Sequence, residues 1–266
     1  HTDLGRIGFN EGCILFIPMG TAYRFLFAPS INTSLVVGYE FPEKIFLSHH
    51  HYIEQYPVPD SAIYPVYPRD IDDIPDITNP KEWYVTARYF NAPSQRLQFP
   101  FSPFDAIAWE GSRYPFRLYS RDVRAISASN FHLDPTAYTI FLRKDERASI
   151  QLFLPRWVHS LPYPHQNNVT EVLFNHSGYS ARPTIRDGCL TYHPQGIFHG
   201  PDLSLLNAER ANDQEANPKG TWRNEIGILL ESVSPLEIIL PARLTRLTEI
   251  DDYEDSWRKQ YAKLGL

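Results

Sequence analysis

The sequence is poor in cysteine, with only Cys13 and Cys189 in 266 residues. Two cysteines cannot form the disulfide framework of a small secreted domain, so the sequence fits a reducing compartment and we expect a cytoplasmic protein. The chain also has no apolar run of the length that a membrane-spanning helix needs, and no signal-peptide pattern opens it. We therefore expect no membrane partner.

Clusters of positive charge are missing as well. The 25 Lys and Arg residues are dispersed along the chain, and 31 Asp and Glu residues outweigh them to give a net charge of −6. A nucleic-acid-binding domain normally carries a basic patch or stripe that contacts the phosphate backbone. The composition therefore argues against a nucleic-acid partner.

Runs with the 3.6-residue period of a helix are few. The chain has instead 23 prolines and 14% aromatic residues, which is the composition of many short strands joined by rigid turns. We expect an all-β protein of sandwiches or barrels, large enough for one big domain or two modules. Near the C-terminus, aromatic and leucine residues spaced three and four apart predict a short terminal helix over residues 252–263.

Apolar runs between turn signals predict strands in several places. These are Gly5–Phe9, Cys13–Ile17, Tyr23–Phe27, Ser34–Tyr39, Trp83–Phe90, Ile107–Trp109, Ala137–Leu142 and Ile150–Leu154. A segment rich in Pro and Asp over residues 48–82 separates the fourth of these runs from the fifth, and we expect an irregular loop there.

A short motif occurs once in each half of the chain, which makes an internal repeat. The nonapeptide GCILFIPMG that begins at Gly12 aligns without a gap with GCLTYHPQG, which begins at Gly188. At the positions of His193 and His199 the first copy has an isoleucine and a tyrosine. We interpret the repeat as a duplicated β-barrel in which only the C-terminal copy kept a metal site.

The strongest candidate for chemistry lies within residues 163–202, which hold four of the ten histidines. His165 precedes Glu171 by six residues, and His193 precedes His199 by the same spacing. Side chains at even offsets in an extended strand lie on one face, so two segments can each present two metal-binding groups to a shared cavity. Two imidazoles and one carboxylate, with coordination positions left open, suit non-haem Fe(II) and oxygen chemistry. The fourth group would lie beside the metal.

The alternative is that these are ordinary surface or hydrogen-bonded histidines, which are more common than ligands in a β-rich protein. The turn residues Pro194-Gln195-Gly196 favour the metal site, because they place a tight turn between His193 and His199. A turn-bounded hairpin with a histidine at each end is well suited to build such a site.

Several blocks of sequence occur in the order typical of one enzyme family. They are FDAIAWEG from Phe104 with Tyr114-Pro115, FHLDP from Phe131, LPRW from Leu154, YPHQN from Tyr163 with Glu171, and HGPD from His199. The P-x-G-x-x-H turn over residues 194–199 also resembles the second motif of cupins. Together these blocks resemble the homogentisate 1,2-dioxygenases, and weaker similarity extends from the first residues to the terminal helix.

The resemblance implies a bicupin fold of two double-stranded β-helix (jelly-roll) barrels. On this basis we expect residues 1–105 to form an incomplete, degenerate N-terminal barrel with its loop, and residues 106–266 to form the metal-binding barrel with the terminal helix. Family members that act as single chains carry a long N-terminal portion that this sequence lacks. The resemblance therefore implies a homo-oligomer, or a second subunit or N-terminal fragment that completes the first barrel.

The resemblance also implies Fe(II)-dependent cleavage of a hydroquinone-type ring, homogentisate or a close analogue, with insertion of both atoms of O2 in aromatic-compound catabolism. Carried over residue by residue, it makes His165, Glu171 and His199 the iron ligands. It places His132 and His193 beside the open positions, where a histidine can take a proton from the substrate or donate one. The candidate substrate contacts are Tyr163, Asn167, Tyr179 and Glu231.

Other functions stay open on the sequence. This sequence also resembles the hydroquinone dioxygenases, which are built from two kinds of subunit. That resemblance lies in the same His-x-Asn-x-x-x-Glu run, which here begins at His165. Two histidines and a glutamate also suit catalytic zinc, so a zinc-dependent cupin isomerase or hydrolase fits the same residues. A metal-free cupin binding module is the third alternative, because the first copy of the repeat already lacks both histidines.

Overall fold

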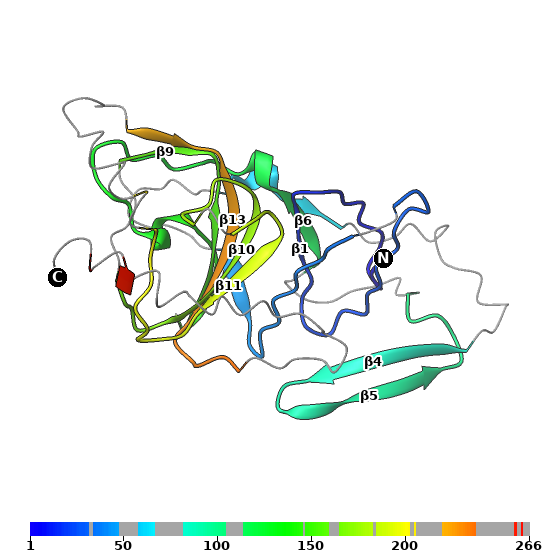
Figure 1. The fold of residues 1–266 in the computed structure, drawn as a ribbon. Helices are drawn as coiled ribbons and strands as arrows, with labels where there is room; N and C mark the ends of the chain where they lie inside the picture. Colours follow the sequence, from blue (N-terminus) through cyan, green and yellow to red (C-terminus); the bar gives the residue numbers. More distant parts are fainter. Residues whose placement is uncertain are drawn as a thin grey trace. The chain divides into compact units, whose positions relative to one another are not determined.

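The computed structural model describes residues 1–31, 34–47, 58–66, 82–104, 114–145, 147–159, 165–182, 185–202, 205, 220–237, 258–259 and 262. It divides into two compact units. The first comprises His1–Arg124 with Ile140–Lys144, and the second comprises Ala125–Thr139 with Asp145–Leu266. In both units the regular structure of the described residues consists mainly of antiparallel strands (Figure 1).

The first unit holds three sets of paired strands. These are β1 (Cys13–Phe16), β6 (Phe116–Tyr119) and β3 (Tyr64–Pro65), in that order; β2 (Ile45–Leu47) with β7 (Thr139–Arg143); and the hairpin of β4 (Trp83–Tyr89) and β5 (Ala92–Phe99). The unit also contains two short 3-10 helices, η1 (Asp60–Ala62) and η3 (Ser120–Asp122). Phe16 stacks on both Phe116 and Phe141, with ring centroids 4.7 and 5.8 Å apart, so aromatic side chains join these strands into a core.

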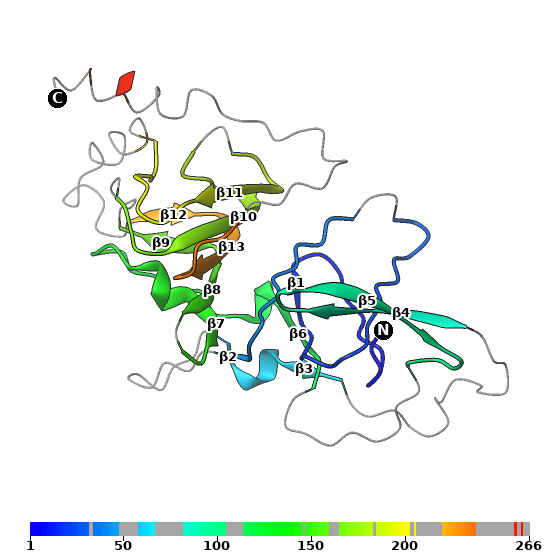
Figure 2. The same cartoon turned by 90° about the horizontal axis from the view of Figure 1, so that it is seen from below.

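The second unit holds the strands of the candidate site. They are β8 (Ala148–Phe153), β9 (Arg156–Val158), β10 (Thr170–Gly178), β11 (Cys189–His193), β12 (Thr221–Arg223) and β13 (Glu225–Ser232), preceded by the 3-10 turn η4 (Pro135–Tyr138). Antiparallel pairing gives the order β11-β10-β13-β8, and β9 pairs with β12 (Figure 2). Tyr138, Phe153 and Leu229 form its buried core cluster.

The prediction of an all-β protein is confirmed in its broad sense, since the sheets are antiparallel. The cupin topology and the division into barrels over residues 1–105 and 106–266 stay predictions. Of the predicted terminal helix, the structure describes only residues 258, 259 and 262, which have helical conformation. No helix of the described residues is long and apolar enough to cross a membrane.

Four of the predicted strands overlap β1, β4, β7 and β8, whereas Ile107–Trp109 lies outside the described residues. The predictions for Gly5–Phe9, Tyr23–Phe27 and Ser34–Tyr39 were wrong, because these segments form no regular strand and only Gly5 and Tyr23 take part in isolated bridges. An apolar run supplies side chains for a strand, but a strand also needs a neighbouring chain for its backbone hydrogen bonds. The predicted loop over residues 48–82 contains η1 and β3 in its described part.

The internal repeat of the sequence is also a repeat of local backbone. Strands β1 and β11 both begin at the repeated cysteine, whose N–H donates at 3.2 Å to the carbonyl three residues back. In each copy the proline carbonyl accepts a bond from the N–H three residues on, across a turn whose glycine has a φ of 82° or 74°. A positive φ at the third residue is the geometry of a type II turn, which glycine adopts without strain. The two copies therefore share both strand and turn.

Gly178 ends β10 at a point where two backbone segments almost touch. It has a φ of 90°, and a Cβ placed there would lie 1.6 Å from the carbonyl oxygen of Asn224. That oxygen accepts a hydrogen bond from Tyr179 N at 3.0 Å, so it cannot withdraw without breaking the pairing. Gly196 also has a positive φ, but nothing lies within 4 Å of the position of its Cβ.

We predict that Gly178→Ala destabilises the protein far more than Gly196→Ala. The Gly196 variant should lose only the cost of a left-handed alanine, about 1–2 kcal/mol, whereas the Gly178 variant adds a backbone clash and should lose more than about 3 kcal/mol. Urea unfolding of the metal-free proteins measures both free energies of unfolding. Equal losses would show that the close approach at Asn224 does not constrain the fold.

Candidate metal centre

The candidate site is built on one row of residues that crosses the strands of the second unit. Glu171 in β10 is the register partner of His193 in β11 and of Glu231 in β13. Glu231 is in turn the partner of Ser149 in β8. Figure 1 shows β11, β10 and β13 side by side. Directly paired side chains lie on one face with their Cβ atoms about 4.5–5.5 Å apart. The register therefore brings a histidine, two carboxylates and a hydroxyl together on one face.

His165 and His199 are joined to each other through their backbones. They form an isolated antiparallel bridge, in which each N–H donates to the carbonyl of the other at 2.8 Å. Their ring centroids are 4.6 Å apart. The candidate ligand atoms of His165, Glu171 and His199 all lie within 4.8 Å of one another. Glu171 and His199 are buried and His165 is half-buried, so the cluster is shielded from solvent on most sides.

The orientation of His199 leaves one ring nitrogen without a hydrogen-bond partner. Its Nδ1 lies 2.8 Å from the carbonyl oxygen of Ile197, which can only accept, so Nδ1 carries the proton of the neutral ring. The lone pair on Nε2 then faces Glu171 Oε2 at 3.0 Å. That contact has ion-pair distance but not hydrogen-bond direction, and the buried Nε2 has no hydrogen bond to any described residue. A bound cation or a proton between the two atoms would satisfy both, so these residues fit a metal ion.

The ionised state of the Glu171 carboxyl also favours a cation. Burial by itself raises the pKa of the Glu171 carboxyl, but the contacts with His193 and His199 outweigh it and hold this pKa well below its usual range. The pKa of His193 is lowered overall, chiefly by burial, although the Glu171 carboxylate acts to raise it. At His199 burial also lowers the pKa, but Glu171 and the Ile197 carbonyl raise it overall. An ionised carboxylate is the form that binds a metal.

Asn167 lies on the carboxylate rather than away from it. Its Nδ2 donates to Glu171 Oε1 at 2.6 Å, so this amide fixes the rotation of the carboxylate and leaves Oε2 facing the histidines. The sequence predicts Asn167 as a substrate contact, and that role stays a prediction. The geometry adds the role of orienting a candidate ligand, which sequence spacing could not reveal.

The other predicted site residues lie at different distances from the cluster. His193 is part of it, since its Nδ1 is 3.0 Å from Glu171 Oε2 and its ring stacks on that of His199 with centroids 4.3 Å apart. His132 is exposed, and no hydrogen bond or ring contact joins it to the cluster in the described part of the chain. Tyr163 lies outside the described residues.

Tyr179 and Glu231 are held by contacts of their own. Tyr179 follows the far end of β10 from Glu171, and the Arg223 guanidinium lies 4.1 Å from its ring centroid. Burial raises the pKa of the Tyr179 hydroxyl. Glu231 accepts bonds from Gln151 Nε2 at 2.6 Å and from Ser149 Oγ at 3.2 Å. Burial and the charge of Glu171 raise the Glu231 pKa.

Sequence reasoning missed Gln151 and Ser149, which support Glu231 from β8. Gln151 is fully buried in the otherwise apolar end of its strand. A buried amide needs hydrogen-bond partners, so a glutamine within an apolar strand was the signal that could have found this contact.

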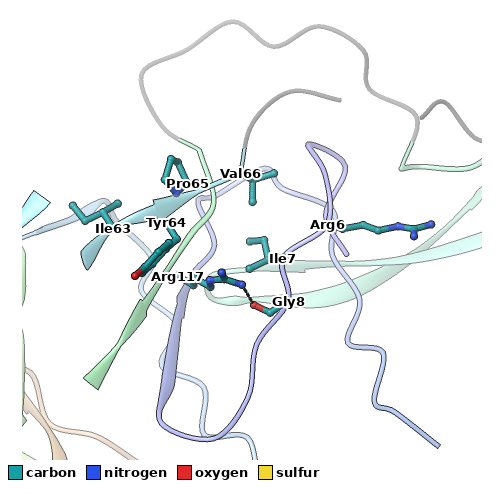
Figure 3. A pocket seen from close by; sticks show the side chains of 8 residues that line it. All are labelled: Arg6, Ile7, Gly8, Ile63, Tyr64, Pro65, Val66 and Arg117. Atoms are coloured by element: carbon teal, nitrogen blue, oxygen red, sulfur yellow. Dashed lines mark hydrogen bonds between the residues drawn. The ribbon is translucent and has the colours of Figure 1, made fainter. Parts of the chain in front are cut away.

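A pocket of about 290 Å³ lies in the first unit, lined by residues 6–8, 63–66 and Arg117 (Figure 3). Arg117 donates to the carbonyl oxygen of Gly8, and Figure 3 shows the Arg6 side chain pointing away from Arg117. No predicted site residue lines this pocket, so it adds nothing to the candidate metal centre.

Comparison with known proteins relates this chain to dioxygenases. No protein-family model matches it. A protein of Saccharolobus solfataricus named as a dioxygenase is 29% identical over 266 residues, which cover 95% of this chain and 64% of that protein. The homogentisate 1,2-dioxygenase of Emericella nidulans is 23% identical over 87% of this chain and 53% of its own length. That of Rhodopseudomonas palustris strain BisB5 is 28% identical over 61% of this chain and 38% of its own length. The chain thus spans between 38% and 64% of these relatives.

We predict that Glu171→Ala abolishes metal retention, as do His165→Ala and His199→Ala, and that combining them adds no further loss because the three ligands act as a unit. His193→Asn should keep the metal. Iron content after anaerobic loading and desalting measures this, with His176→Ala, a histidine of β10 outside the cluster, as the control. Full iron content in Glu171→Ala would refute the ligand set, and loss of iron in His193→Asn would make that residue a ligand.

Proposed function

We propose that this chain is the metal-binding part of an Fe(II)-dependent dioxygenase that opens the aromatic ring of a hydroquinone-type substrate. Homogentisate or a close analogue is the proposed substrate, and both atoms of O2 are inserted. The observation that carries the proposal is the convergence of His165, Glu171 and His199 on one buried point, in a chain related to dioxygenases.

The donor set suits this chemistry. Two imidazoles and a carboxylate hold Fe(II) and leave positions open for other ligands. When bound, iron(II) supplies the redox chemistry that allows a spin-paired aromatic ring to react with dioxygen. The protein supplies the rest: Asn167 fixes the carboxylate of Glu171 at 2.6 Å, and the Ile197 carbonyl fixes the ring of His199 at 2.8 Å.

Proton transfer is proposed for two histidines. His193 is half-buried on the same cross-strand row as Glu171, which supports a role in proton transfer to or from the substrate. His132 is exposed, and the family resemblance supports it as the other histidine beside the open positions, where it would take or donate a proton. Glu231 lies next to Glu171 on the sheet face, which supports its proposed contact with substrate. The substrate contacts of Tyr163, Asn167 and Tyr179 rest on the resemblance.

A protein partner is proposed for residues 1–40. Phe25, Leu26 and Phe27 are 36%, 60% and 45% exposed although large and apolar, and residues 24–27 form no regular strand. Phe9 contacts both phenylalanine rings edge-on, at centroid distances of 5.8 and 6.2 Å, which makes an aromatic surface. Extended apolar segments with unpaired backbone favour pairing with another chain. We propose that a further polypeptide, from a homo-oligomer or a second subunit, pairs with this segment.

The proposed function predicts that the protein contains iron and that it consumes O2 with a hydroquinone-type substrate. Protein purified without oxygen should contain iron, and an oxygen electrode should record uptake of O2 with homogentisate, with hydroquinone as the comparison substrate. His193→Asn should keep iron while kcat falls about 10²- to 10⁴-fold, as for a lost acid or base. Zinc in place of iron, with no O2 uptake, would overturn the proposal in favour of a zinc-dependent enzyme. Protein that is purified without metal and retains no iron after loading would favour a metal-free binding module.

The partner proposal predicts a complex larger than one 30.8 kDa chain. Native size analysis should give a larger mass, and denaturing electrophoresis of the same peak shows whether the second polypeptide is another copy or a different chain. Replacing Phe25 and Phe27 with Ser should reduce the native mass, whereas Phe90→Ser, which alters an exposed phenylalanine of the β4–β5 hairpin, should not. An active single chain of the wild-type protein would refute the partner.

A further inference from the structure

A second carboxylate, that of Glu231, lies beside the candidate metal centre without being part of it. In the row across the sheet, Glu231 is paired with Ser149 of β8 on one side and with Glu171 of β10 on the other. Directly paired side chains have Cβ atoms about 4.5–5.5 Å apart, so the two carboxylates are close neighbours. The ligand atoms that come together are nevertheless those of His165, Glu171 and His199. A fourth potential ligand is thus adjacent to the cluster but outside it.

The side chain of Gln151 holds Glu231 toward β8. Its Nε2 donates to Glu231 Oε2 at 2.6 Å and to Ser149 Oγ at 2.9 Å, and Ser149 Oγ donates to the same Oε2 at 3.2 Å. Gln151 is fully buried opposite Leu229, where an amide is costly unless it makes hydrogen bonds. The Oε1 of this amide is buried without a hydrogen-bond partner in the described chain, so only the bonds of Nε2 offset that cost.

The forces on Glu231 change when a cation is bound beside it. Without a cation, the like charges of Glu171 and Glu231 repel each other, and nothing draws the second carboxylate toward the cluster. With a divalent cation at the cluster, Glu231 is attracted, because a bound ion is often the largest local charge. The hydrogen bonds from β8 then keep Glu231 from becoming a fourth protein ligand, which leaves coordination positions open for other ligands.

We propose that Gln151 is a positioning residue of the metal centre, which holds the Glu231 carboxylate against β8 and so keeps it off the metal. This deepens the proposed function and rests on it only in requiring a metal ion at the cluster. Two amides then act on two carboxylates with opposite results, since Asn167 fixes Glu171 facing the histidines and Gln151 holds Glu231 away from them. The competing explanation is structural: Gln151 could satisfy a buried carboxylate without any effect on the metal.

Binding of Co(II) separates these explanations without requiring turnover. Competition with a chelator measures the Co(II) affinity, and titration of the cobalt protein with azide, followed by visible absorption, reports whether a coordination position is open. In Gln151→Leu the released Glu231 should bind the ion, so Co(II) affinity should rise and azide affinity should fall, each about 10-fold or more through the added charged ligand. Both changes should vanish in a Glu231→Gln background, because the two residues act as a unit.

Thr191→Val is the matched control. Thr191 lies in the same cross-strand row as Gln151, and its buried Oγ1 has no hydrogen-bond partner among the described residues, so its loss should change neither affinity. Unchanged affinities in Gln151→Leu would overturn the proposal, and weaker Co(II) binding in both backgrounds would make Gln151 purely structural. Gln151→Met replaces the leucine variant if that does not fold. If neither folds, Ser149→Ala removes the other donor to the same oxygen, and unchanged azide affinity there would overturn the proposal.

Oxygen uptake separates this inference from the proposed function. Co(II) binding with the expected dependence on Gln151, in a protein that takes up no O2 when loaded with iron, would refute the dioxygenase and retain the role of Gln151. O2 uptake by a protein whose azide affinity is independent of Gln151 would retain the dioxygenase and refute that role. No binding of Co(II) by the wild-type protein would overturn both the metal centre and this inference.

Discussion

The buried carboxylate of Glu171 is the constraint on which the candidate site depends. A carboxylate taken out of water is costly unless its oxygens are hydrogen-bonded or paired. Here Oε1 accepts from Asn167 at 2.6 Å, and two imidazole nitrogens lie 3.0 Å from Oε2. The β10–β11 register and the bridge between His165 and His199 hold these groups in place. The ionised Glu171 therefore needs His193, which the sheet register places beside it, and His199, which the turn and the bridge with His165 place beside it.

A second carboxylate beside the first adds to this constraint. Glu231 is the direct neighbour of Glu171 across the β10–β13 pair, and like charges directly opposite each other destabilise a sheet. Bonds from Gln151 and Ser149 hold Glu231, while burial and the charge of Glu171 raise its pKa. This face of the sheet is thus built from polar groups that an ordinary core would exclude. Such an arrangement is typical of a site that is kept for chemistry rather than for stability.

The two copies of the internal repeat separate scaffold from chemistry. Both have a strand that begins at a cysteine and a turn closed by a glycine of positive φ, so the residues that fix the backbone are shared. His193 lies between these fixed points and His199 lies three residues beyond the glycine, so neither histidine is one of the shared residues. A duplicated strand and turn can therefore lose its ligands without losing its shape, and the first copy has an isoleucine and a tyrosine at these positions.

The sequence by itself determined the all-β class and the strand-and-turn repeat, because Gly, Pro and strand periodicity act on local backbone. It pointed to His165, Glu171 and His199 through the family resemblance rather than through strand spacing, since no continuous strand joins His165 to Glu171 or His193 to His199. It did not determine which segments pair, and Tyr23–Phe27 has strand composition without a regular strand. Only the tertiary structure decided that Asn167 orients the carboxylate and that His132 is exposed. The physical reason is that spacing within a strand fixes the face of a side chain, whereas its neighbours across the sheet depend on register and on loops that return from far along the chain.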